Sequence, residues 1–188
     1  GDKMHVDAIT EVIDLKLSYP NTALLGLQYD AEQFSNVAKV AVDLKGLKIQ
    51  VPLNYDPVAR TYATTGPGTT TGGAWDGTFK RAYSNNPAWI YYDLCTNKRA
   101  ALGDRLTAAM IDKWSLYRLA QYCDQLVDDG KGGQEPRFTC NVYLQTQEDA
   151  YSILSKLAGV FRAISYWDGS SIVCDADIPQ DTYFTYTR

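Results

Sequence analysis

The side chains that most often perform catalysis are sparse in this sequence, and their spacing suits little chemistry. His5 is the single histidine of the 188 residues. Serine triads, histidine–cysteine dyads and histidine-based zinc sites need an imidazole as base or ligand. With one histidine near the N-terminus, the sequence argues against all three kinds of site. The cysteines include no C-x-x-C pair, and each lies in an apolar or alternating stretch, which predicts structural thiols rather than disulfides or metal ligands. They are Cys95, Cys123, Cys140 and Cys174.

Acidic residues occur in pairs, and glycoside hydrolysis needs two carboxyl groups on either side of a sugar bond. The pairs are Asp128 with Asp129, Glu148 with Asp149, and Asp175 with Asp177. Helix caps and solvated turns explain each pair, and we expect these structural roles. The acidic segment 124–135 fits no EF-hand calcium loop, because Pro136 occupies the position of the bidentate glutamate. We therefore predict no catalytic residue, no cofactor and no metal.

Residues 52–86 contain three prolines and a glycine- and threonine-rich tract at 64–73. Within the tract, Gly66, Pro67 and Gly68 superficially resemble a phosphate-binding loop, but the lysine and third glycine of such loops are missing. This composition predicts a long loop without secondary structure. We expect residues 64–73 to be mobile and dispensable for folding.

Aromatic side chains are abundant, with 14 tyrosines, 4 tryptophans and 5 phenylalanines. Five of them follow the glycine-rich tract closely: Trp75, Tyr83, Trp89, Tyr91 and Tyr92. Tryptophan and tyrosine can stack on sugars, so a carbohydrate-binding module is one reading. The same residues are favoured in cores and at protein interfaces, where a polar tip stays in water above an apolar body. We interpret this cluster as core plus a possible subunit interface.

Composition excludes several classes of protein. The chain carries 18 basic and 22 acidic residues, with a net charge of −4 and a pI near 4.9. A nucleic-acid binder needs a basic face against the phosphate backbone, so no specific nucleic-acid binding is expected. No apolar run approaches the roughly 20 residues of a membrane span, so no membrane insertion by this chain is expected. Both chain ends suggest a fragment of a longer protein.

Hydrophobic periodicity indicates an α+β fold. Antiparallel strands dominate the N-terminal part, where apolar and polar residues alternate around Leu15, Leu27, Val42 and Ile49. The C-terminal part mixes helices and strands. Helices are predicted at 87–94, 107–127 and 147–165, and strands at 138–144, 171–174 and 183–187. We divide the chain into a β-rich segment, 1–74, which ends in the threonine- and glycine-rich loop, and an α+β segment, 75–188, although one continuous domain is equally compatible.

Six blocks in order resemble the tail-tip protein J family, the host-specificity proteins of lambda-like phages. The blocks are residues 19–24, 50–57, 75–86, 112–114, 121–125 and 132–144. The tract at 64–74 departs from the family pattern and resembles an insertion. The resemblance implies an internal fragment of a hub protein, upstream of the distal parts that contact the host receptor.

The resemblance also implies partners and a location. The family's members form a homotrimer in the intact tail tip and contact other tail-tip and tail-tube proteins. They would be synthesised and assembled in the cytoplasm of the bacterial host and end in the virion. The resemblance supplies no catalytic residue, so we expect a structural protein and not an enzyme. The alternatives are a carbohydrate-binding module and a tail-associated cell-wall hydrolase domain.

Overall fold

The computed structural model describes residues 19–20, 22–28, 36, 39–98, 102–143, 150–176 and 178. The chain divides into two units, Gly1–Leu44 and Lys45–Arg188. All helices and strands of the described residues belong to the second unit, and they combine three α-helices with short antiparallel strand pairs. The predicted α+β fold class is confirmed.

The strands predicted around Leu27 and Val42 are not formed in the described residues 22–28 and 39–48. Alternation indicates that one face of a segment needs an apolar cover, whereas a strand also needs a neighbour for its backbone hydrogen bonds. The described part of the chain supplies no such neighbour to these two segments. The strand predicted around Leu15 lies outside the described residues.

The strand predicted around Ile49 is confirmed, but residues 52–86 also form strands, so the prediction of a loop without secondary structure there is wrong. Strand β1 (Ile49–Pro52) pairs with β4 (Phe79–Ala82), and β2 (Tyr55–Asp56) pairs with β3 (Thr61–Tyr62). The β2–β3 turn closes tightly because the Asp56 carboxylate accepts hydrogen bonds from the backbone N–H groups of Val58 and Ala59 at 2.8 and 3.1 Å.

Residues 68–78 are held by backbone hydrogen bonds, against the expectation of a mobile tract. Thr70 N donates to Ala74 O at 2.7 Å, and Asp76 N donates to Gly68 O at 3.0 Å. Gly68 is buried with φ +83°, and a Cβ placed there would lie 2.7 Å from the Asn54 nitrogen. Only glycine fits this close backbone approach. The order of the loop therefore depends on a contact with residues 53–54, which sequence composition does not reveal.

Helix α1 (Pro87–Thr96) begins where the sequence predicts it, because the Asn86 side chain accepts a hydrogen bond from Ala88 N at 3.0 Å. The single helix expected over 107–127 is wrong. It is replaced by a 3₁₀ turn, η1 (Ala108–Met110), and by α2 (Lys113–Asp124). The Asp112 carboxylate caps α2 by accepting from Trp114 N at 3.0 Å, which separates the two elements.

The C-terminal elements are a hairpin, a helix and a second hairpin. Strands β5 (Leu126–Asp128) and β6 (Gln134–Pro136) form the first hairpin, and α3 (Ala150–Val160) leads into β7 (Ala163–Trp167) and β8 (Ile172–Ala176). The predicted helix 147–165 therefore extends too far. A residue with positive φ, Arg162 (55°), turns the chain, and Ile164 lies in a strand instead of on a helix face.

No strand forms over residues 138–143, contrary to the sequence prediction for 138–144. This segment is held by separate backbone hydrogen bonds, from Phe138 N to Cys123 O at 3.1 Å and from Cys140 N to Asn85 O at 2.8 Å. The edge strand expected at 183–187 lies outside the described residues. The strand expected at 171–174 is confirmed as part of β8.

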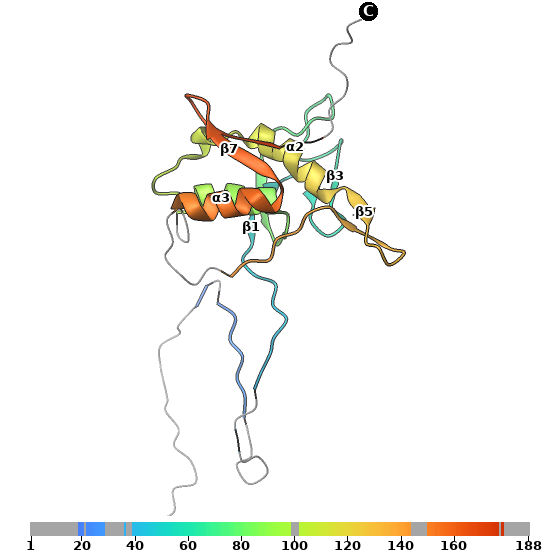
Figure 1. Ribbon diagram of the computed structural model, residues 1–188, viewed down its shortest axis with the longest axis vertical. Helices are drawn as coiled ribbons and strands as arrows, with labels where there is room; N and C mark the ends of the chain where they lie inside the picture. The colour runs from blue at the N-terminus through green and yellow to red at the C-terminus, as the bar shows by residue number, and fades with distance from the viewer. Residues whose placement is uncertain are drawn as a thin grey trace, which may run out of the picture. The chain divides into compact units, whose positions relative to one another are not determined.

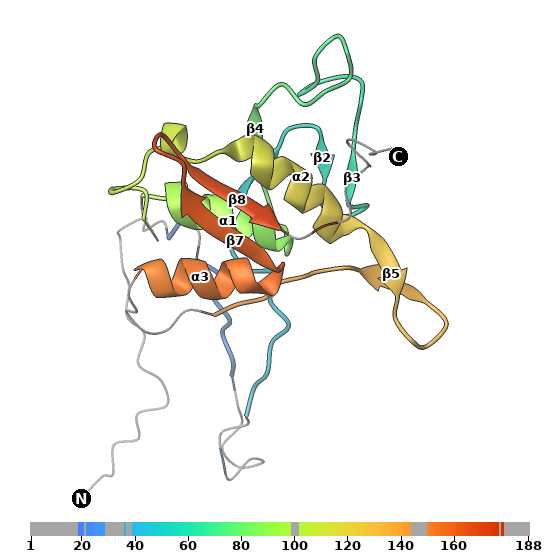
Figure 2. The same cartoon turned by 45° about the horizontal axis from the view of Figure 1, so that its top comes forward.

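Helix α1 is the centre of the second unit. It packs against β1, α2 and α3, while β7 lies along α3 and β8 along α2 (Figures 1 and 2). Its side chains at 88, 89, 91, 92 and 95 are buried, and Leu116, Leu157 and Phe161 pack around them from the other helices and the turn before β7. Among the described residues, no helix is long and apolar enough to cross a membrane.

Candidate functional site

The five aromatic residues assigned from sequence to core and interface are brought to one part of the second unit. Four side chains are almost completely buried, with exposed fractions of 2% for Trp75, 0% for Trp89, 1% for Tyr91 and 3% for Tyr92. Tyr83 is partly exposed. Their role in a subunit interface stays a prediction. Because the other four rings fill the core, a neighbouring subunit that contacts this segment would meet Tyr83.

The buried rings contact one another closely. Trp75 stacks on Tyr117, with ring centroids 4.9 Å apart and an interplanar angle of 11°, and meets Trp89 edge-on at 5.9 Å. Phe79 stacks on Tyr92 at 4.6 Å. The Trp75 indole N–H donates to Thr78 O at 2.8 Å, which satisfies its polar atom. A sugar platform needs an accessible ring face, and buried Trp75 and Trp89 do not offer one.

Lys113 lies over the outer side of this aromatic core. Its Nζ is 5.5 Å from the Trp75 ring centroid and 5.1 Å from that of Trp114, and it donates to Gly77 O at 3.0 Å. These are cation–π distances. Trp114 is half exposed, so the ammonium group joins a buried ring to one that reaches the surface. This arrangement orders the start of α2 against the 75–79 turn.

A buried polar network connects the β2–β3 turn to the end of α2. Arg60 Nη1 lies 2.7 Å from Asp124 Oδ1, and the Tyr62 hydroxyl donates to Asp124 Oδ2 at 2.8 Å. Arg60 also donates to Asn85. Burial of the Tyr62 hydroxyl raises its pKa, and the negative charge of Asp124 raises it further. Both oxygens of the Asp124 carboxylate are therefore engaged in structural contacts.

The paired acids that are described accept hydrogen bonds from nearby backbone N–H groups. Asp129 accepts from the backbone N–H groups of Lys131 and Gly133 at 2.7 and 2.9 Å, and these bonds lower the pKa of its carboxyl group. Asp128 accepts from Gly130 N at 2.8 Å. Asp175 accepts from the next backbone N–H, that of Ala176, at 2.9 Å. Glu148, Asp149 and Asp177 lie outside the described residues, as does His5.

The cysteines are free thiols, as the sequence predicts. Three of them, Cys95, Cys123 and Cys174, are buried, and Cys140 is partly exposed. Burial raises the pKa of each buried thiol to about 12. A thiol that stays protonated at neutral pH is a poor nucleophile and a poor metal ligand. Within the described part of the chain, no group of three or more His, Cys, Asp or Glu residues could hold a metal ion.

The apolar side chains that remain accessible are different from those that the sequence indicates. On β7, Ile164 is 73% exposed, Tyr166 is 49% exposed and Trp167 is 55% exposed. The sequence prediction places Ile164 in the helix 147–165 and assigns no strand to residues 163–167. The alternation of small Ala163 and Ser165 with larger Ile164 and Tyr166 was the signal that could have revealed a strand with an apolar outer face.

Comparison with known proteins gives matches along the chain, although no protein-family profile matches it. The tip attachment protein J of Escherichia phage SECphi27 is 43% identical over 188 residues, which is 100% of this chain and 15% of that protein. The protein of the same name from Escherichia phage SECphi4 is 44% identical over 176 residues, covering 94% of this chain and 15% of that protein. The chain therefore spans about one seventh of the length of these curated relatives.

Proposed function

Because the chain is homologous to a segment of the tip attachment protein J family, as its ordered sequence blocks predict, we propose that it is a structural part of a phage tail tip. The observation that carries the proposal is 43% identity over all 188 residues. In this role the chain is part of a hub subunit that links the tail tube to the central fibre. It belongs to the host-attachment apparatus without itself recognising the host.

We infer that the chain acts as part of a homotrimer and contacts other tail-tip and tail-tube proteins. The exposed side chains of Ile164, Tyr166 and Trp167 support a protein-contacting role, because adjacent exposed apolar residues commonly mark interaction sites. Tyr83 is the second candidate contact. The parent protein is assembled in the cytoplasm of the bacterial host and then belongs to the virion, and regions outside this chain contact the receptor.

The proposed role is not catalytic. The described carboxylates considered for hydrolysis bind nearby backbone N–H groups: Asp128 and Asp129 in the β5–β6 turn, and Asp175 at Ala176. Incubation of the purified chain with peptidoglycan and oligosaccharides is expected to release no more product than buffer. Turnover that a single aspartate substitution abolishes would contradict this part of the proposal and favour the hydrolase alternative.

Quantitative mass spectrometry of purified virions tests the structural role. Peptides of this chain are expected in infectious particles at three copies per virion, measured against isotope-labelled standards, with the tail-tube protein as the internal control for tail number. Absence of the chain from particles, or a copy number other than three, contradicts the trimeric hub. Heads purified from host cells that are lysed before tails attach should lack these peptides.

A competition assay separates a hub role from host recognition. Excess purified chain is expected to leave the rate of phage adsorption to host cells unchanged. If the chain alone blocked adsorption, it would itself bind the receptor or a surface sugar. That result would support the carbohydrate-binding alternative and contradict the hub role.

A further inference from the structure

The β7–β8 hairpin has two edges that differ in their backbone pairing. On the β8 side, Ile172 forms a parallel bridge with Ile111, and Asp112 N donates to Ile172 O at 3.0 Å. The far side of β7 is different. None of the residues in 39–98, 102–143 and 150–176 pairs with it. Among the residues that the structure describes, one edge of this sheet is therefore paired and the other has no strand neighbour.

Strand β7 contains no lysine and no proline, two residues that protect many edge strands. Natural edge strands discourage further pairing with lysines, prolines or bulges. Strand β7 reads Ala-Ile-Ser-Tyr-Trp, and its register with β8 runs without a bulge from Ala163↔Ala176 to Trp167↔Ile172. The side chains of Ile164 and Tyr166 alternate with buried Ala163 and half-buried Ser165, so they form an exposed apolar row beside the unpaired edge. Such an edge is suited to accept one more strand.

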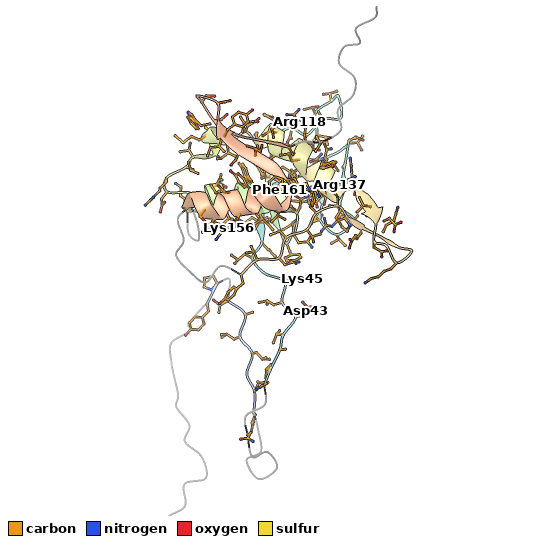
Figure 3. The ribbon with its side chains drawn as sticks, in the orientation of Figure 1. Asp43, Lys45, Arg118, Arg137, Lys156 and Phe161 are labelled. Carbon is orange, nitrogen blue, oxygen red and sulfur yellow. The ribbon has the colours of Figure 1, made fainter. Side chains whose placement is uncertain are left out.

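Residues 39–48 have the alternating pattern of a strand but no strand partner among the described residues. In residues 39–48, Val40, Val42 and Leu44 alternate with Ala41 and Asp43, and the three larger side chains are 50%, 63% and 66% exposed. Asp43 and Lys45 can be located in this segment in Figure 3.

The two elements also carry opposite charges. Residues 163–176 contain Asp168 and Asp175 and no lysine or arginine. Residues 39–48 contain three lysines and one aspartate. The hairpin therefore carries a net charge of −2 and the segment a net charge of +2, and complementary charges steer association and fix its orientation. We propose that residues 39–48 of one copy add as a strand to the unpaired edge of β7 in a neighbouring copy.

This contact rests on the proposed function, in which copies of the chain meet in the tail tip. It is a head-to-tail contact, because each copy gives one segment and accepts another on a different surface. Such contacts close into a ring when the rotation between successive copies completes a full turn, and otherwise they build an open filament. The proposal therefore identifies the two complementary surfaces that a cyclic trimer requires, and it assigns the exposed apolar row of β7 to burial between copies.

Cysteine cross-linking between differently tagged copies tests the contact. In a background with Cys140→Ser, which removes the partly exposed thiol, Val42→Cys chains are mixed with Ile164→Cys chains under mild oxidation. Disulfide-linked pairs of the two tagged chains are expected, at a yield at least tenfold above either variant alone. No mixed disulfide, or equal yields from the single variants, overturns the proposal. An intramolecular disulfide in a diluted chain that carries both Val42→Cys and Ile164→Cys also overturns it.

A charge at the edge provides the second test. Ile164→Lys puts a lysine on the exposed row and is expected to abolish self-association of the 188-residue chain in sedimentation experiments. The control is Val58→Lys, since Val58 is 90% exposed on the β2–β3 turn, and it should associate like the unmodified chain. A chain that sediments as a monomer at every concentration overturns the strand contact. The proposed tail-tip role would then still stand or fall on the virion copy number.

Discussion

Arg60 and Asp124 form an ion pair that joins the β2–β3 turn to the last residue of α2, with Nη1 and Oδ1 2.7 Å apart across 64 residues of sequence. The Asp124 side chain is 2% exposed and that of Arg60 is 14% exposed. A second donor, the Tyr62 hydroxyl, occupies the other carboxylate oxygen. This pair fixes the small β2–β3 sheet to the helical core.

Removing the positive partner should destabilise the fold strongly. Arg60→Leu leaves Asp124 buried without a compensating charge, and breaking a buried pair in this way costs about 3–5 kcal/mol. The measurement is urea unfolding followed by circular dichroism. Arg118→Leu, a change of the same chemistry at an exposed position of α2, should alter stability by no more than about 0.5 kcal/mol. Similar losses for the two variants would show that the pair does not anchor the turn.

Two glycines of the 64–73 tract should differ sharply. Both Gly66 and Gly68 have positive φ, so alanine at either position is strained by about 1–2 kcal/mol. At Gly68 the added Cβ also meets Asn54 N at 2.7 Å and Leu53 Cβ at 2.8 Å, whereas at Gly66 nothing lies within 4 Å. Overpacking should therefore add about 1–3 kcal/mol to Gly68→Ala alone. Equal unfolding midpoints for the two variants would mean that residues 68–78 do not pack on 53–54.

The buried side of α3 should be sensitive to truncation. Leu157 is 6% exposed and packs in the core, so Leu157→Ala should cost about 2–5 kcal/mol of unfolding free energy. Ser155→Ala, two residues earlier and exposed, should remain within about 0.5 kcal/mol. Thermal and denaturant unfolding of both variants give the comparison. A harmless Leu157→Ala would place α3 outside the folded core.

Alkaline pH should weaken the fold through its buried thiols. Burial raises the pKa of Cys95, Cys123 and Cys174 from the usual 9.0 to about 12, so each thiol ionises first in the unfolded chain. The stabilisation is fully present below pH 9 and is lost as the pH rises toward 12, with a slope of about −1.4 kcal/mol per pH unit for each thiol. Unfolding free energies measured across this range should fall, and Cys95→Ala should make the fall shallower. A flat profile would contradict the burial of these thiols.

Local sequence signals predict the elements whose stabilising contacts lie within a few residues. Asn86 before Pro87 is a cap followed by a favoured first helical residue, and both features need only neighbouring backbone. Leu154 and Leu157, three residues apart, share one face of α3 and are buried as their spacing predicts. Asp112 was missed as a cap because the apolar residues before it continue the helical pattern.

Contacts between distant segments explain the remaining differences. The order of residues 68–78 follows from the approach of Gly68 to residues 53–54, which no composition rule contains. The strand predicted at 138–144 has the right alternation, but a strand forms only where a neighbour accepts its hydrogen bonds. Tryptophan and tyrosine are common both at interfaces and in cores, so sequence does not distinguish the two locations. The packing around α1 buries the side chains of Trp75, Trp89, Tyr91 and Tyr92.

Gold labelling of virions measures the central proposal most directly. Antibodies raised against the purified 188-residue chain, bound to gold particles, are applied to intact phage and viewed by electron microscopy. Gold should lie at the tail end distal to the head, and no gold should lie on the heads or along the tail tube. Gold on the head, along the tail wall or on no part of the particle would contradict a place for this chain in the tail tip.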